Sequence, residues 1–136
     1  MTENEIAREV LDAAFVVHTK LGPGLFETVY DVVLACELRK KKLSVERQCP
    51  VPIVYDGIRF DEAFRLNLLV GLRVIVEAKL VECLTRLHAK QLLTHLPLAN
   101  LKLGLLINFG EAHLKNGIKR IINGTLEPEE PPDFSL

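Results

Sequence analysis

Val74-Ile75-Val76-Glu77-Ala78-Lys79-Leu80 is a stretch near the middle of the chain in which five residues are apolar and two are charged. Its apolar content predicts a buried strand, and alternate side chains of a strand point to opposite faces. Glu77 and Lys79 therefore project from one face together with Ile75, while the other face carries only apolar side chains. Because a buried charge is costly unless it is paired, hydrogen-bonded or bound to a metal, this pair marks the candidate functional site.

The residues before this strand predict a hairpin that brings a third polar residue to the pair. A strand is expected over 58–70, and a three-residue loop then lets Val70 face Val74. This register places Asn67 opposite Glu77, at the distance of about 4.5–5.5 Å between Cβ atoms that is typical of facing residues. One sheet face is expected to gather Arg65, Asn67, Glu77 and Lys79. The opposite face is expected to carry Phe64, Leu66, Leu68 and Val70.

Helical and extended segments alternate along the rest of the chain. Apolar residues at helical spacing predict helices over about 3–20 and 25–41, the first begun by a capping box from Thr2 to Glu5, and Thr85 can cap a third helix through about residue 96. Extended segments are expected at 43–55, 101–109 and 118–122, with a helical turn near 111–115. We therefore expect one α/β domain over residues 1–124 and a flexible, acidic, proline-rich tail over 125–136.

Composition narrows the class of protein. The hydrophobic fraction of 49% and charged fraction of 26% are those of a globular domain. No apolar run reaches the roughly 18 residues that span a bilayer, and the start of the chain is acidic, unlike a signal peptide. A cytoplasmic location without a membrane partner is expected. The net charge of -1 argues against coating of nucleic acid by bulk electrostatics, so a nucleic acid partner requires a local basic patch.

The three cysteines, Cys36, Cys49 and Cys83, are odd in number and widely spaced. That spacing argues against a disulfide framework or a structural zinc site. We expect them to act as small buried hydrophobic residues.

Gly24-Leu25-Phe26-Glu27-Thr28-Val29-Tyr30 matches the motif that names the GxxExxY proteins. The likeness continues, in order, at Asp56-Gly57, Glu77-Ala78-Lys79, His88–Leu93 and Gly104–Gly110. Over about residues 5–122 the chain resembles the GxxExxY family, a small branch of the PD-(D/E)XK nuclease superfamily. The resemblance implies a restriction-endonuclease-like fold, a mixed sheet flanked by helices, and a Mg²⁺-dependent site for phosphodiester hydrolysis.

The resemblance also implies roles for particular residues. It makes Glu77, Lys79 and Gln91 the catalytic residues. It makes Glu27, Asn67, Glu77 and the backbone carbonyl of Ala78 the metal ligands. Oxygen ligands suit Mg²⁺ or Mn²⁺, and a lysine beside them can orient the attacking water and offset charge on the phosphate. DNA or RNA is the implied partner, and a homodimer is expected by analogy with small nucleases of this fold.

Asn67 departs from the pattern, which expects an aspartate there. An amide oxygen can ligate a metal but brings no charge, so the sequence is compatible with a weakened nuclease or with a catalytically dead domain that binds nucleic acid or a protein partner. Asp31 or Glu62 could supply the missing charge, although the strand period turns Glu62 away from Asn67. In addition, His95 stands where a tyrosine follows the helix glutamine in RecB-like branches.

Ordinary structural roles stay open for the same residues. Glu77 and Lys79 can form a salt bridge within one strand. An acid in the first turn of a helix, such as Glu27, interacts favourably with the helix dipole. Tyr30 fits a core residue whose hydroxyl binds a neighbour better than it fits a nucleophile.

Overall fold

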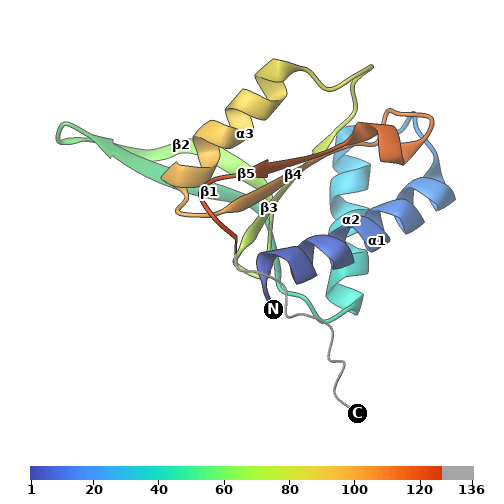
Figure 1. The fold of residues 1–136 in the computed structure, drawn as a ribbon. Coiled ribbons are helices and arrows are strands. Elements are labelled where there is room, and N and C mark those ends of the chain that lie inside the picture. The colour runs from blue at the N-terminus through green and yellow to red at the C-terminus, as the bar shows by residue number, and fades with distance from the viewer. Residues whose placement is uncertain (127–136) are drawn as a thin grey trace, which may run out of the picture.

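The computed structural model describes residues 1–126, which form a mixed five-stranded sheet between helices. The elements are α1 (Glu3–Leu21), α2 (Glu27–Lys40), β1 (Val45–Tyr55), β2 (Ile58–Val70), β3 (Val74–Lys79), α3 (Arg86–Leu98), β4 (Leu103–Asn108), the 3₁₀ turn η1 (Leu114–Gly117) and β5 (Ile118–Ile122). Figure 1 shows α1 and α2 on one face of the sheet and α3 on the other. The expected α/β architecture is therefore confirmed.

The strands lie in sequence order, and all neighbours are antiparallel except β3 and β4. That parallel pair is joined by α3, as a crossover connection requires. β4 is buried at every position, so this strand is covered on both faces of the sheet. In the hairpin, Val70 faces Val74 as expected.

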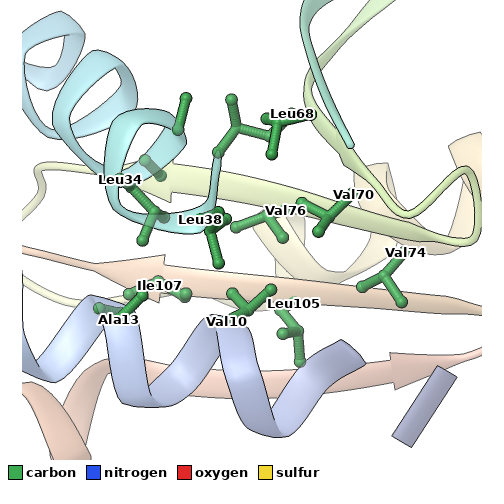
Figure 2. Close-up of a cluster of buried hydrophobic side chains, with 14 of the residues drawn as sticks. Val10, Ala13, Leu34, Leu38, Leu68, Val70, Val74, Val76, Leu105 and Ile107 are labelled. Atoms are coloured by element: carbon green, nitrogen blue, oxygen red, sulfur yellow. The ribbon is translucent and has the colours of Figure 1, made fainter. Parts of the chain in front are cut away.

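The larger core lies between the sheet and the two N-terminal helices. α1 begins with the expected capping box, in which Thr2 Oγ1 accepts a bond from the Glu5 amide and the Glu5 carboxylate accepts one from the Thr2 amide, both at 3.2 Å. Its apolar stripe and that of α2 then bury against the sheet (Figure 2). The residues labelled there are Val10, Ala13, Leu34, Leu38, Leu68, Val70, Val74, Val76, Leu105 and Ile107.

A smaller core lies under α3. Leu92 and Leu96 of this helix pack on Ile75 and Leu106 of the central strands. The helix can approach because Gly104 has no side chain: a Cβ there would lie 2.7 Å from Leu92 Cδ2. The face of β3 that carries Glu77 and Lys79 is therefore the face under α3.

The side chains of β2 change from one face of the sheet to the other at Asn67. Leu68 belongs to the larger core, yet Leu66 belongs to the core under α3, although residues two apart share a face in a flat strand. The β2–β3 ladder ends at the Leu68–Val76 pair, and Gln48 on β1 has a φ of 53°. Beyond this point β1 and β2 continue as a two-stranded arm (Figure 1).

Two expectations about β2 are wrong because of this change of direction. Phe64 and Leu66 pack on the α3 side and not on the side of Leu68. Arg65 does not face Lys79, because the ladder has already ended; it forms an ion pair with Glu62 on the exposed arm. A uniform strand period cannot anticipate a local twist of this kind.

Other expectations have mixed outcomes. Cys36 and Cys83 are exposed, which contradicts their expected burial, and all three cysteines are free, as their spacing indicated.

Of the expected tail, only residues 125 and 126 are described, and Leu126 packs against the larger core; residues 127–136 lie outside the described part. Within residues 1–126, no helix is both long and apolar enough to cross a membrane.

Candidate functional site

A small pocket between β3 and α3 brings together the three residues expected to be catalytic. It is lined by Glu77, Lys79, His88, Gln91, Leu92, His95 and Leu106. Its volume of about 30 Å³ holds one or two water molecules, since each needs roughly 10–15 Å³ measured in this way. A pocket of this size can hold a reacting water but not a nucleotide, so any large substrate must lie over its mouth.

Glu77 is the most perturbed acid of this pocket. Its Oε1 atom is buried and finds no hydrogen-bond partner among the residues that the structure describes. The pKa of Glu77 is raised to about 7, chiefly by burial, with smaller upward contributions from the charges of Glu27 and Asp31; the charge of Lys79 and a hydrogen bond from the Asn67 backbone N–H oppose the rise. A buried carboxylate oxygen without a donor is rare in folded proteins, and a bound cation would satisfy it.

Glu77 and Lys79 do not form the salt bridge that an ordinary structural role would predict. No ion pair of residues 1–126 joins the Lys79 ammonium nitrogen to a Glu77 carboxylate oxygen within 4.0 Å. Lys79 is still close enough to lower the pKa of Glu77. The lysine therefore supplies a positive charge to the pocket without closing off the carboxylate.

Asn67 lies beside Glu77 at the place where β2 leaves β3. Its Oδ1 accepts a hydrogen bond of 2.9 Å from the Ala78 amide. In a strand the N–H and C=O of one residue point toward the same neighbour, so the Ala78 carbonyl lies on this same edge. Because the β2–β3 ladder has ended, Asn67 and Ala78 place two neutral oxygen atoms on the edge of β3 next to Glu77.

α2 contributes two acids of very different exposure. Glu27, the first residue of the helix, is exposed, whereas Asp31 is only 2% exposed. Asp31 Oδ2 accepts bonds from Arg47 Nη2 at 2.9 Å and from Gln48 Nε2 at 3.5 Å, but Asp31 Oδ1 is buried without a partner. Glu62, the other acid considered as compensation for Asn67, is engaged by Arg65 on the arm and does not join the site.

The candidate metal donors of this region are of one chemical kind. Residues 1–126 contain no group of three or more Asp, Glu, His or Cys side chains placed to hold a metal. The candidate donors on and beside β3 are all oxygen atoms: the unpartnered Oε1 of Glu77, Oδ1 of Asn67 and the Ala78 carbonyl. Oxygen donors suit Mg²⁺ or Mn²⁺, which complete their coordination with water.

Asn108, which the sequence reading passed over, fixes the end of β3. It is fully buried, and its side chain accepts bonds from the amides of Val81 and Gly110, both at 3.0 Å, and donates one to the Val81 carbonyl at 2.8 Å. The Lys79 carbonyl accepts a further bond from the Phe109 amide at 2.8 Å. An asparagine at the end of an otherwise apolar strand was the sequence signal for this role, because a buried side-chain amide needs several hydrogen-bond partners.

Tyr30 has the core role that its sequence context favoured. Its hydroxyl donates to the Gly22 carbonyl at 2.5 Å and accepts from the Leu25 amide at 3.1 Å. Its ring stacks on Phe109, with centroids 4.7 Å apart. The tyrosine thus holds the loop from which α2, and with it Glu27, begins.

The two histidines of α3 have structural partners. His95 stacks on Phe64 with ring centroids 4.1 Å apart, and burial lowers its pKa. His88 Nδ1 accepts a bond of 3.0 Å from the Thr85 amide at the start of the helix. Among the described residues these histidines form no metal cluster. His95 therefore fills the place of the expected tyrosine as an aromatic ring that packs against the arm.

A comparison with known families gives one match. The family model described as the PD-(D/E)XK nuclease superfamily matches residues 4–121. The match runs from α1 into β5 and so includes every element of the site. No curated protein and no solved structure matches the chain.

Proposed function

Because the chain belongs to the PD-(D/E)XK nuclease superfamily, we propose that it hydrolyses phosphodiester bonds of DNA or RNA at the pocket of Glu77, Lys79 and Gln91. The observation that carries this proposal is the Glu77 Oε1 atom, which among the described residues is buried without a hydrogen-bond partner, in a pocket shared with a lysine that forms no ion pair with it. Such an arrangement is unfavourable in the folded protein unless a ligand completes it. Within the superfamily, Gly24, Glu27 and Tyr30 support the finer assignment to the GxxExxY branch.

Four groups are proposed to hold Mg²⁺ or Mn²⁺ in this protein. They are the carboxylates of Glu27 and Glu77, the amide oxygen of Asn67 and the backbone carbonyl of Ala78. The chemistry supplied by a bound cation is the polarisation of a phosphate oxygen and a lowered pKa of a coordinated water. Glu27, being exposed, is positioned to act through water.

The remaining steps fall to side chains of the pocket. Lys79 orients the attacking water and offsets the negative charge that builds on the phosphate oxygens. Gln91, from α3, hydrogen-bonds the same water or a phosphate oxygen. As the water oxygen bonds to phosphorus, the bond to the leaving oxygen breaks and that oxygen takes up a proton. The apolar floor formed by Leu92 and Leu106 strengthens these electrostatic effects by excluding bulk water.

Nuclease assays with Mg²⁺ or Mn²⁺ on single- and double-stranded DNA and RNA test the proposal. We expect the wild type to cleave at least one of these substrates and Lys79→Ala to lose about 10²- to 10⁴-fold in rate. Lys102→Ala, a charge change on an exposed residue before β4, is the matched control and should retain activity. Cleavage that survives Lys79→Ala would contradict the assignment of this pocket.

The second candidate is a nuclease-fold domain that binds nucleic acid or a protein partner without cleaving. Asn67 favours it, because this residue brings no charge and its Oδ1 is already bound to the Ala78 amide. In that case the wild type gives no cleavage with either metal, and Asn67→Asp restores it. Fluorescence anisotropy with labelled oligonucleotides then reports whether binding persists. A cytoplasmic location and a homodimer remain predictions from the sequence.

A further inference from the structure

Two further cavities lie beyond the pocket of Glu77, at the edge of the sheet where the parallel strands β3 and β4 end. Pro23, Leu80 and Gly110 are among the residues that line the nearer cavity, of about 370 Å³. Leu80 directly follows Lys79, which is the last residue of β3 and lines the Glu77 pocket. Ligands of open α/β sheets bind outside the carboxyl ends of the strands. The nearer cavity therefore lies where a substrate that covers the Glu77 pocket would continue.

The farther cavity, of about 530 Å³, shares Pro23 with the nearer one and extends to the 3₁₀ turn η1. Phe15, His113 and Lys115 line it, and all three are exposed. Of the described residues that line the two cavities, only Glu82 is acidic, and it is exposed as well. Each cavity has the size of a site for a small molecule, about 300–1,000 Å³. The two cavities together are called the edge groove.

Three buried polar side chains that take no part in the proposed reaction fix the walls of the edge groove. The Tyr30 hydroxyl holds the loop before α2. The Asn108 side chain holds the backbone of the segments that follow β3 and β4. His18 Nε2 donates a bond of 2.7 Å to the Glu111 carbonyl and so ties the segment before η1 to α1. The groove is therefore preformed, which reduces the ordering cost of binding.

The chemistry of the edge groove suits a single strand of nucleic acid. Lys115 carries the positive charge that attracts a phosphate group, and His113, which lines the same cavity, can donate a hydrogen bond. The exposed ring of Phe15 offers a surface on which a base can stack. Proteins that bind single strands combine a basic groove along the backbone with aromatic rings for the bases. Bases paired in a duplex are stacked on one another and do not reach such a ring.

We propose that the edge groove binds the strand of nucleic acid whose scissile phosphate lies over the Glu77 pocket, and that it binds this strand in single-stranded form. Lys115 contacts a phosphate group of the strand, and Phe15 stacks on one of its bases. Glu82 weakens binding by repelling the phosphates. The inference rests on the proposed function, because this strand is the substrate of the Glu77 pocket.

Fluorescence anisotropy with labelled oligonucleotides of about 12 nucleotides measures the Kd of the full chain. The oligonucleotides are DNA and RNA, each as a single strand and as a duplex of the same sequence. EDTA removes divalent metal, so that metal-dependent cleavage does not disturb the measurement. We expect the wild type to bind single strands more tightly than duplexes. Equal or tighter binding of duplexes would overturn the inference.

Lys115→Ala should raise the Kd for single strands and make it less dependent on salt. Loss of one phosphate contact reduces the slope of log Kd against log salt concentration by about 0.7 for a single strand. Lys102→Ala is the matched control, because Lys102 is an exposed lysine before β4, at the opposite end of that strand. Glu82→Gln should bind more tightly than the wild type. An unchanged slope in Lys115→Ala, or weaker binding by Glu82→Gln, would overturn the inference.

Phe15→Ala should raise the Kd for single strands about fivefold or more, because stacking on one base is lost. Its salt slope should equal that of the wild type, and Phe15→Tyr, which keeps a ring, should bind as the wild type does. Phe60→Ala is the matched control: Phe60 lies on the arm and is 48% exposed, against 41% for Phe15. A Kd of Phe15→Ala within twofold of the wild-type value would contradict the stacking contact and overturn the inference.

The outcomes separate this inference from the function on which it rests. If the wild type cleaves, but Lys115→Ala and Phe15→Ala bind single strands as it does, only the role of the edge groove is overturned. If both variants bind more weakly and the wild type cleaves with neither metal, the edge groove stands and hydrolysis is overturned. If the wild type binds no oligonucleotide, the edge groove is overturned whatever the cleavage assays show.

Discussion

At Glu77, opposing effects act on a single carboxyl group. Burial favours its protonated form, and the charges of Glu27 and Asp31 add to that preference. The charge of Lys79 and a hydrogen bond from the Asn67 backbone N–H favour the ionised form but do not compensate fully, so the pKa is raised to about 7. An ionised Glu77 therefore destabilises the metal-free protein, and this cost is what a bound cation can recover.

Glu77→Gln should make stability less dependent on pH. The folded-state pKa of about 7 lies above the ordinary 4.5. Ionisation of Glu77 therefore takes no free energy of unfolding from the wild type below pH 4.5, a growing amount between pH 4.5 and 7, and the full amount above pH 7. At roughly 1.4 kcal/mol per pKa unit that cost is about 3 kcal/mol. Urea unfolding in the presence of EDTA measures this difference. We expect Glu77→Gln to have a larger free energy of unfolding than the wild type at pH 8, and no such advantage at pH 4.5. A difference that is the same at both pH values would contradict the explanation.

Tyr30→Phe should destabilise the protein by about 1–2 kcal/mol, because the Gly22 carbonyl and the Leu25 amide both lose the hydroxyl partner. Tyr55→Phe removes the same hydroxyl from a side chain that is 72% exposed on the arm, and it serves as the control. Urea unfolding of both variants gives the comparison. Equal effects would show that the Tyr30 hydroxyl does not hold the loop before α2.

Among the elements, β3 and α3 set the geometry of the pocket. β3 carries Glu77 and Lys79 on the face that α3 covers, and the closeness of α3 depends on the absence of a side chain at Gly104. The change of direction of β2 at Asn67 exposes the edge of β3 on which the Ala78 carbonyl lies. The pocket therefore depends on the close contact between Gly104 and Leu92 and on the interruption of the β2–β3 ladder at Asn67.

Gly104→Ala should destabilise the protein by about 1–3 kcal/mol, because the added methyl group would overlap with Leu92. Leu92→Ala alone removes buried surface and costs about 2–5 kcal/mol. In the Gly104→Ala background Leu92→Ala should cost less, since it also relieves the overlap. A double-mutant cycle from urea unfolding measures this coupling, and strictly additive effects would show that the contact does not limit the position of α3.

For the whole molecule, stability is unevenly distributed. The central strands are buried on both faces, whereas the far half of the β1–β2 arm is exposed along its length. Apolar residues lie exposed near its tip: Val54, Tyr55, Ile58 and Phe60. A two-stranded ribbon without a covering layer is only marginally stable.

Hydrogen exchange should reveal this difference directly. Amides within residues 53–60 are expected to exchange through local opening, at a small free-energy cost, while those of β4 exchange only when the whole domain unfolds. Mass spectrometry of exchanged peptides, with and without urea, measures both. Equal protection of the arm and β4 would indicate that the arm is covered, for instance by a second copy of the chain.

The sequence by itself determined the features that depend on neighbouring residues. The capping box, the helical stripes, the Ile58–Val70 and Ile118–Ile122 strands and the shared face of Glu77 and Lys79 all follow from local hydrogen bonds and fixed periods, and the structure has them. Tertiary structure decided what depends on distant segments. Asp31 is oriented by Arg47, sixteen residues away, and Asn108 binds the backbone of Val81, twenty-seven residues away.

The side on which Phe64 and Leu66 pack was also decided by tertiary structure, because the twist of β2 at Asn67 arises where β2 parts from β3. The exposure of Cys36 and Cys83 is a property of the same kind. Burial and pairing of a side chain are set by what the rest of the chain packs against it. The sequence therefore identified the strand that carries the candidate site, and the tertiary structure decided which side chains are buried and which partners they have.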